Sequence, residues 1–381
     1  MTKHNQFACA ISLLALLVLL VACAAPTAEP LKPTAIPAAT QAPLPTAALA
    51  STTAVTPAAP VATSPAATTK GSCGTLRLLF WQAATILNPH LASGSKDWNA
   101  VRLVNEPLAS LDANGKIDVQ YGLAVQVPTM ENGGIAADGS SLTWKLKKDV
   151  KWSDGTPFTA DDVIFTWQYV TNKDTAASSS TTMSEIKIVE KVDDYTVKIV
   201  WNRPNPTPFL PFIGDYGMII QKKAFENYIG AKAKDAPANL KPVGTGPYVV
   251  REFKPNDVVT YDLNPNYRDA TKPCFKEVLM KGGGDATSAA RAVLQTGDAD
   301  YAWNLQVDAD VLQSMMTPGG KGKVVSSPSG TLERLAINFT NPDPALGDKR
   351  SEPGNPHPYL TDLKVRQALA LAVDRQTIAK Q

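Results

Sequence analysis

Histidine and catalytic sequence motifs are scarce in this chain of 381 residues. It contains three histidines, and His4 lies in an N-terminal stretch that we expect to be removed, which leaves His90 and His357. No HExxH, CxxC or GxSxG motif occurs. Catalysis or metal binding by histidine requires several such groups to be brought together. These absences argue against an enzyme, and we expect no cofactor and no resident metal.

The chain also lacks an excess of charge of either sign. It has 37 basic and 35 acidic residues, which gives a formal net charge of +2. A balance of this kind produces no field that would attract nucleic acid or an anionic membrane. We therefore expect no nucleic-acid partner.

The first 23 residues have the pattern of an export signal. Lys3 and His4 precede an uncharged run from Phe7 to Ala22, and small residues close that run ahead of Cys23. The run is too short for a membrane span, which needs about 20 residues. The sequence LVAC at 20–23 resembles a bacterial lipobox, so we expect Cys23 to be lipidated as the new N-terminus. An ordinary secretory signal cleaved nearby is the alternative.

Residues 24–70 lack the means to build a core. Thirty-five of these forty-seven residues are Ala, Pro or Thr, none is aromatic, and only Glu29, Lys32 and Lys70 carry charge. A segment of this composition is expected to be disordered, with extended polyproline character. It predicts a tether that holds a folded body away from a membrane, and a tether favours lipidation of Cys23.

Two cysteines remain in the expected mature body. Cys73 and Cys274 each stand just before a short apolar run, and the two runs cover residues 76–80 and 278–280. If those runs are adjacent parallel strands, the two sulfur atoms meet at one sheet edge. Our hypothesis is a disulfide, which would close a loop of about 200 residues and stabilise the fold by at most about 5 kcal/mol. Two buried free thiols are the alternative.

The pattern of the body indicates an α/β fold. Strands are expected over residues 76–80 and 299–303, helices over 98–108, 160–170 and 286–296, and a hairpin over 248–263. The segment WSDGTPFTADD at 152–162 contains several carboxylates, but they do not alternate as the ligands of a calcium loop do. We interpret it as a turn followed by a helix that Thr159 caps.

Four stretches in a fixed order resemble a known family. They are WKLKKDVKWSDGTPFTADDV at 144–163, GTGPY at 244–248, NPNY at 264–267, and DLKVRQAL at 362–369 ahead of Asp374 and Arg375. Together they resemble the extracellular solute-binding proteins of the peptide and nickel type, also called family 5. One such match would be weak, whereas four in sequence over about 300 residues are a specific pattern.

The resemblance implies a periplasmic-binding-protein-like type II clamp of two lobes, with a β-rich subdomain inserted in the first. Carried over to this chain, lobe I comprises residues 71–107 and 205–303, and the inserted hairpin-rich subdomain comprises 108–204. Lobe II begins at residue 304 and is incomplete at 381, because related chains continue further. We therefore expect a fragment of a longer protein that by itself binds no peptide tightly.

The resemblance also suggests where a ligand binds. In similar proteins, the loop equivalent to Ser93, Gly94 and Ser95 approaches the main chain of a bound peptide, and its backbone groups here are expected to pair with an extended peptide. A solvated glycine turn is the alternative. Trp303 and Asn304 lie where lobe I passes into lobe II, so they are expected to line the cleft, although Trp303 would look the same as a core residue. Trp81 and Trp98 are weaker candidates, because tryptophans in strands and helices are usually buried.

These observations predict an extracytoplasmic binding protein that is lipid-anchored to the cell membrane. It would act as a monomer, capture a peptide or another small solute by hinge closure and deliver it to an ABC permease. A scaffold of the same kind that binds nickel chelates or oligosaccharides is one alternative. A lipid-anchored hydrolase or adhesin is the alternative from another class, but the sequence offers a hydrolase no recognised nucleophile and base.

Overall fold

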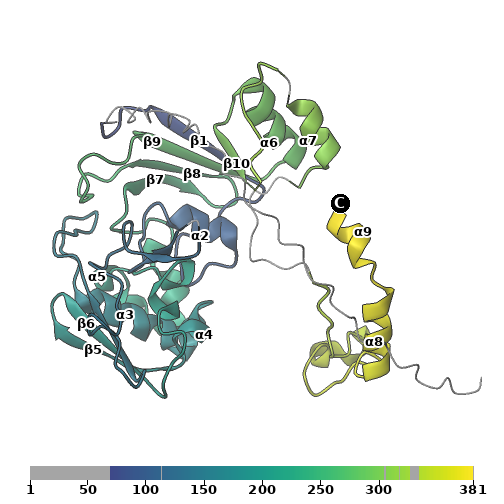
Figure 1. Ribbon diagram of the computed structural model, residues 1–381, viewed down its shortest axis with the longest axis horizontal. Helices are drawn as coiled ribbons and strands as arrows, with labels where there is room; N and C mark the ends of the chain where they lie inside the picture. Colours follow the sequence, from purple (N-terminus) through teal and green to yellow (C-terminus); the bar gives the residue numbers. More distant parts are fainter. Residues whose placement is uncertain (1–68, 113, 304–305, 317, 327–333, 381) are drawn as a thin grey trace, which may run out of the picture. The chain divides into compact units, whose positions relative to one another are not determined.

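A computed structural model describes residues 69–112, 114–303, 306–316, 318–326 and 334–380, and the fold is given for these residues. Five strands form one mixed sheet in the order β10-β1-β9-β8-β7 (Figure 1). Their bounds are β1 Thr75–Phe80, β7 Tyr248–Lys254, β8 Val258–Leu263, β9 Glu277–Gly282 and β10 Tyr301–Trp303. Strand β1 runs parallel to β9 and β10, whereas β8 pairs antiparallel with β9 and β7. Two segments distant in sequence therefore build one sheet.

One face of this sheet is covered by helix α2, Ser95–Val101, and the residues that follow it. Ala100 and Val104 are fully buried there with Leu87, and the Tyr261 hydroxyl donates to the Ala100 carbonyl at 2.8 Å. Helix α2 is shorter than the expected helix over 98–108 and begins three residues earlier. Beyond its end, the carbonyls of Leu103 and Val104 accept from the N–H groups of Tyr248 and Gly246 and do not continue the helix.

A second core belongs to a three-stranded antiparallel sheet in the order β4-β6-β5 and to the long helix beside it. The bounds are β4 Ser141–Lys145, β5 Ile186–Asp193, β6 Thr196–Trp201 and α3 Ala160–Thr171. Trp144, Phe158 and Tyr169 are fully buried in it. Burying one large apolar side chain contributes about 1.5–3 kcal/mol, so these rings are a major source of stability.

The predicted cap of helix α3 is confirmed. The Thr159 side chain accepts from the N–H of Asp161 at 3.3 Å, and the Asp162 carboxylate accepts from the N–H of Thr159 at 3.1 Å. Asp162 also accepts from the Trp152 indole N–H and from the N–H of Lys222. The acidic motif is therefore a structural element that ties a turn, a helix and residue 222 together.

Residues 209–238 join the core of the three-stranded sheet. Phe212, Ile220 and Phe225 are buried against it. The sequence prediction groups 205–303 with lobe I, and this boundary stays a prediction; the structure shows that the first part of the range packs on the core of the three-stranded sheet. The sequence hid this contact, because the segment consists of short turns and has no regular period.

A buried ion pair bridges the segments that carry the two cores. Arg268 follows β8, and its guanidinium forms two hydrogen bonds of 2.7 and 2.8 Å to the Glu106 carboxylate, which follows α2. The two side chains are only 9 and 6% exposed. Removing either partner of such a pair strongly destabilises the fold, because the remaining charge would be buried alone.

The other described elements are short. They are β2 Ser110–Leu111, β3 Ile117–Asp118, α4 Ser180–Met183, α5 Lys222–Phe225, α6 Ala286–Arg291 with the π turn Ala292–Thr296, α7 Ala309–Met315, α8 Leu363–Ala372 and α9 Arg375–Lys380, and 3-10 turns at Lys173–Thr175, Leu210–Phe212, Asp215–Gly217, Glu226–Tyr228, Gly230–Asp235, Pro237–Asn239 and Pro344–Lys349. The helical stretch 286–296 matches the expected helix, and Gly297 ends it in the left-handed conformation, φ +74°.

Helix α8 begins as its sequence suggests but is not covered. The Asp362 side chain caps it by accepting from the N–H of Lys364 at 2.7 Å. None of the side chains of α8 is buried among the described residues, and Leu371 is 87% exposed. The apolar side chains Leu363, Leu369 and Leu371 of this helix are therefore exposed.

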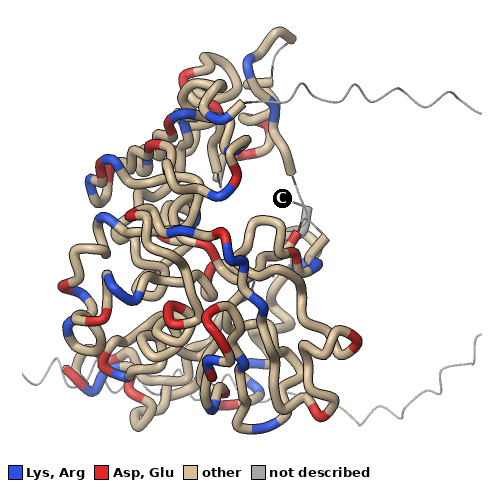
Figure 2. Tube along the Cα trace, turned by 90° about the vertical axis from the view of Figure 1, so that its left-hand side faces the viewer, with Lys and Arg blue, Asp and Glu red and all other residues tan. Residues whose placement is uncertain are grey.

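The distribution of charge along the chain agrees with the nearly equal numbers of basic and acidic residues. Basic and acidic residues are interspersed along the traced chain (Figure 2). Within the ranges that the structure describes, none of the helices is both long and apolar enough to cross a membrane.

Candidate ligand-binding site

The carboxyl ends of the parallel strands are where an α/β sheet usually meets its ligand. At this edge β1 ends at Phe80, which is in register with Gly282 at the end of β9 and with Trp303 at the end of β10. Gly282 has no room for a side chain, because a Cβ atom would overlap the main chain of Ala83. Close backbone packing therefore fixes the start of the loop that leaves β1.

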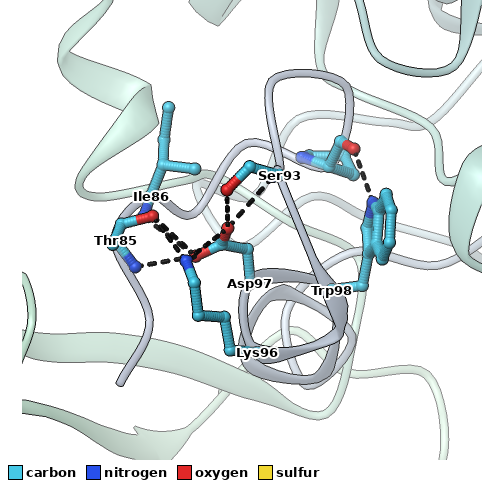
Figure 3. Close-up of polar contacts among 7 residues, drawn as sticks. Thr85, Ile86, Ser93, Lys96, Asp97 and Trp98 are labelled. Carbon is cyan, nitrogen blue, oxygen red and sulfur yellow. Dashed lines mark hydrogen bonds and ion pairs between the residues drawn. The ribbon is translucent and has the colours of Figure 1, made fainter. Parts of the chain in front are cut away.

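The carboxylate of Asp97 binds both ends of this loop (Figure 3). Its side chain is fully buried on helix α2. One oxygen, Oδ1, accepts from the N–H and the hydroxyl of Thr85 at 2.7 and 3.0 Å and from the N–H of Ile86 at 3.4 Å. The other, Oδ2, accepts from the N–H and the hydroxyl of Ser93 at 3.1 and 3.3 Å. The Lys96 ammonium lies 2.9 Å from Oδ2, so both ends of the loop are tied to one carboxylate.

The same contacts keep Asp97 ionised. Burial alone would raise the pKa of this carboxyl, but the hydrogen bond from Thr85, the Lys96 ammonium and the hydrogen bond from Ser93 outweigh it, so the pKa lies below its ordinary value of 3.8. A carboxylate that accepts several hydrogen bonds gains rigidity as well as charge stabilisation. We infer that residues 85–93 form a pre-organised loop.

The middle of the loop is anchored to the other core through Asn88. Its side-chain amide donates to the Tyr169 hydroxyl at 3.1 Å and to the Asn239 side-chain oxygen at 2.8 Å. Its own oxygen accepts from the N–H of His90 at 2.9 Å. Asn88 is fully buried, so the middle of the loop is part of the packed interior.

His90 has a structural role. Its ring is fully buried, with Nε2 2.9 Å from the Met218 carbonyl and Nδ1 2.8 Å from the Ser179 hydroxyl. Because a carbonyl can only accept, Nε2 carries the proton and Nδ1 accepts from Ser179. Burial lowers the pKa of His90 to about 4, so the ring is neutral near pH 7. A buried neutral ring of this kind does not contact a solute.

The predicted residues Ser93, Gly94 and Ser95 lie where the loop becomes helix α2. Ser93 and Ser95 are exposed and Gly94 is half-buried. Ser95 begins the helix, with Gly94 as the residue before it. The N–H and hydroxyl of Ser93 are already bound to Asp97, so Ser93 has fewer free donors than a solvated loop would offer.

The structure describes three of the four other candidates. Trp303 is half-buried on β10, with its ring centroid 5.5 Å from that of Phe80, and Asn304 lies outside the described residues. Trp81, just beyond β1, is 42% exposed and so is not a core residue. Trp98 is half-buried on α2.

Cys73 and Cys274 lie at the amino ends of the neighbouring parallel strands β1 and β9. The structure draws their sulfur atoms together as a disulfide, with the Cα atoms 5.2 Å apart. The N–H of Cys73 also donates to the Cys274 carbonyl at 3.0 Å. The bond in the mature protein stays a prediction, and Cys23 lies outside the described residues.

The described residues were also compared with the requirements of a metal site and of a solute pocket. Among them, no group of three or more His, Cys, Asp or Glu side chains is placed to hold a metal ion. Two surface hollows of about 340 and 260 Å³ lie beside helix α3, and neither is lined by the predicted ligand residues. The first is lined by Trp167, Thr171, Ser180, Thr181, Ser184 and Ile186.

Comparison with known proteins shows the lineage of the chain. The oligopeptide-binding protein AppA of Bacillus subtilis is 30% identical over 269 residues, which is 70% of this chain and 44% of AppA. The periplasmic oligopeptide-binding protein OppA of Escherichia coli is 24% identical over 313 residues, 77% of this chain and 52% of OppA. The chain thus spans about half the length of the curated relatives that it matches.

Solved structures agree in fold. MoaA of A. tumefaciens R10 in complex with mannopinic acid has a TM-score of 0.61 at 28% identity and covers 81% of this chain and 57% of its own. NikZ of Campylobacter jejuni in complex with Ni(L-His) has a TM-score of 0.60 at 25% identity, with 81% and 55% covered. The described body is therefore of the type II periplasmic-binding-protein class, as predicted.

The family model of the bacterial extracellular solute-binding proteins, family 5 middle, matches residues 119–381. Members of this family are extracytoplasmic binding proteins of transport systems and not enzymes, in agreement with the scarcity of catalytic residues. The match includes more than half of the chain and continues through the motif at 144–163 to the last residue. The chain belongs to the bacterial extracellular solute-binding proteins of family 5.

Proposed function

We propose that this chain captures peptides outside the cell, by hinge closure, as the substrate-binding component of an ABC importer, and delivers them to a membrane permease. The relatives AppA and OppA are oligopeptide-binding proteins, and AppA has been solved with a bound nonapeptide. The observation that carries the proposal is the loop that Asp97 holds at the carboxyl edge of the sheet. It fixes Ser93, Gly94 and Ser95 at the end of a rigid segment, beside which an extended peptide can lie.

The second part of the proposed site follows β10. Trp303 and Asn304 stand at the passage to residues 304–381, the beginning of the proposed second lobe. Closure of two lobes around a hinge buries a solute and excludes water, and a few residues between the lobes absorb the change in backbone angles. Trp303, packed on Phe80, would report this closure through a change in its fluorescence.

A second candidate ligand class is a small chelate or opine. NikZ was solved with Ni(L-His) and MoaA with mannopinic acid, and both cover more of this chain than AppA does. The same scaffold can thus carry pockets of different chemistry.

Calorimetric titration of the full-length protein with a defined peptide pool, Ni(L-His) and mannopinic acid separates these candidates, because residues 1–381 by themselves are expected to bind no peptide tightly. We expect heat and a shift in tryptophan fluorescence with the peptides and not with the other two compounds. Binding of Ni(L-His) or mannopinic acid alone would replace the peptide proposal. Absence of binding by all three would reject the proposed function for this chain.

We further propose that the mature protein is a monomer held at the cell membrane by lipid on Cys23, with residues 24–70 as the tether. Metabolic labelling with an alkyne fatty acid tests the anchor. Label on the wild type and its loss in Cys23→Ser are expected, and label retained by the variant would reject lipidation at this residue.

The Cys73–Cys274 disulfide is proposed for the mature body as well. Thiol titration of unreduced, denatured mature protein is expected to find neither cysteine reactive, and both are expected to react after reduction. Two reactive thiols before reduction would show that the pair is not oxidised.

A further inference from the structure

Helix α2 presents one stripe of side chains to the outside. Ser95, Trp98 and Arg102 are three and four residues apart, and such residues share a helix face. The opposite stripe, Asp97, Ala100 and Val101, is buried. The outer stripe begins at Ser95, the last residue of the proposed ligand loop, and therefore continues that site along the surface.

Trp98 is held in one orientation. Its indole N–H donates to the Pro89 carbonyl at 2.9 Å (Figure 3). The Trp98 and Tyr216 rings meet edge to face, with centroids 4.8 Å apart and planes at 68°. Tyr216 comes from the 3-10 turn Asp215–Gly217, so two distant segments build the pair.

The turn that carries Tyr216 is itself fixed. Arg102, at the end of α2, donates from Nε to the Asp215 carboxylate at 3.1 Å. Gly217 packs against the backbone of Phe212 so closely that a Cβ atom would overlap it. Tyr216 nevertheless remains 40% exposed. An exposed aromatic ring that is held from two sides loses little conformational freedom when a ligand covers it.

The chemistry of this surface favours an apolar group. The one polar atom of the Trp98 ring is already hydrogen-bonded to Pro89, so what the ring offers is its apolar surface. The positive charge of Arg102 is balanced by Asp215, which makes the surface a poor receptor for a free phosphate or carboxylate. Rigid Tyr and Trp rings are typical anchors of binding surfaces because they offer a large contact area with few torsions.

We propose that Trp98 and Tyr216 form a side-chain subsite that receives a large apolar or aromatic side chain of the captured peptide. This inference rests on the proposed function and adds a preference to it. The main chain of the peptide lies along the loop 93–95, and one of its side chains rests on the aromatic pair. Contact between aromatic rings of this geometry is expected to favour a Phe-containing peptide over an Ala-only peptide by about tenfold.

The test compares two peptides by titration calorimetry on the full-length protein and on three variants of it. The peptides are penta-alanine and Ala-Ala-Phe-Ala-Ala, and the variants are Tyr216→Ala, Tyr216→Phe and Tyr121→Ala. Tyr121 is a matched control, since it is a tyrosine of similar exposure, 54%, that packs with Lys272 instead of α2. We expect wild type, Tyr216→Phe and Tyr121→Ala to prefer the Phe peptide about tenfold and Tyr216→Ala to bind the two peptides within about twofold of each other.

The outcomes separate this inference from the function on which it rests. Binding of both peptides with equal affinity by wild type, or an unchanged preference in Tyr216→Ala, would overturn the subsite while peptide capture stands. Absence of binding of either peptide by wild type would overturn both. A preference lost in Tyr216→Ala and restored in Tyr216→Phe supports the aromatic contact and excludes misfolding as its cause.

Discussion

Replacing Asp97 by asparagine tests the rigidity of the ligand loop directly. The carboxylate accepts on both sides, from Thr85 through Oδ1 and from Ser93 through Oδ2. An amide keeps one acceptor oxygen and places an NH₂ group where the other oxygen was. Turned toward Thr85, the NH₂ group faces the N–H groups of Thr85 and Ile86 and the Lys96 ammonium. Turned toward Ser93, it faces the Ser93 N–H and the same ammonium. At least two hydrogen bonds are therefore lost in either orientation, even where a hydroxyl rotates to accept.

The expected cost follows from these contacts. A hydrogen bond to a charged group contributes about 1.5–3 kcal/mol, so losing two lowers the free energy of unfolding by at least about 3 kcal/mol. The Lys96 ammonium, whose side chain is 13% exposed, loses its ionic partner and adds to this figure. A loss of this size is a large fraction of the 5–15 kcal/mol, roughly, that stabilises a typical domain.

The effect also depends on pH. The pKa of Asp97 is lower in the folded protein than its ordinary value of 3.8, so the unfolded chain binds the proton more readily. The stability that Asp97 contributes is therefore fully present above about pH 4 and is lost as the pH falls through the lower folded value. In Asp97→Asn this part of the acid dependence is absent.

Urea unfolding at pH 7 and hydrogen exchange of residues 85–97 measure the change. Asp161→Asn is the control, because Asp161 is 51% exposed and pairs with Lys191 at the surface, where an ion pair is worth about 1 kcal/mol at most. We expect faster exchange of the loop only in Asp97→Asn. If this variant unfolds with a loss below about 1 kcal/mol and exchanges its loop amides at the wild-type rate, the carboxylate does not organise the loop.

Three further changes test other parts of the structure. Burial holds the pKa of His90 at about 4 in the folded protein, against 6.5 in the unfolded chain. The free energy of unfolding, measured with urea, should therefore fall by about 3 kcal/mol between pH 7 and pH 4. In His90→Gln this part of the pH dependence should be absent. Arg268→Met leaves the Glu106 carboxylate buried alone and should lower the free energy of unfolding by about 3–5 kcal/mol. The double variant Arg268→Met, Glu106→Gln should recover a large part of this loss. Equal losses in the single and the double variant would refute the pairing. Gly282→Ala forces a Cβ atom into the main chain after β1 and should lower the melting temperature by several degrees. Gly94→Ala has open space at its Cβ and should change the melting temperature little. Equal effects of the two substitutions would contradict the close packing at Gly282.

Local chemistry made part of this fold predictable. Thr159 and the acids after it form a cap from neighbouring atoms alone, so its sequence pattern suffices. The ending of a helix at Gly297 is of the same kind. The motif GTGPY at 244–248 is a less local case, because the N–H of Gly246 donates to the Val104 carbonyl, a partner about 140 residues earlier. The family resemblance placed this motif, and its contact comes from the structure.

The candidate site could be predicted only in part, because its organising contacts join segments far apart in sequence. The loop 93–95 was proposed through resemblance, and this stays a prediction; nothing in the pattern showed that Asp97 would bind Ser93 and Thr85. Trp98 was only a weaker candidate, because tryptophans in helices are usually buried, and its spacing from Ser95 and Arg102 was the one available sign of an outer face. Tyr216 was missed, since it becomes relevant only through its contact with Trp98.

The position of β1 has a consequence for how the protein is made. This strand lies between β9 and β10, so its hydrogen-bonding partners are synthesised about 200 residues after it. At about 5–20 residues per second, ribosomes need about 10–40 s to supply them. Through that interval an apolar strand has no sheet to join, and the native pairing has high contact order, which slows folding. The chain is therefore expected to remain translocation-competent until late in synthesis, when the sheet can close around its own first strand.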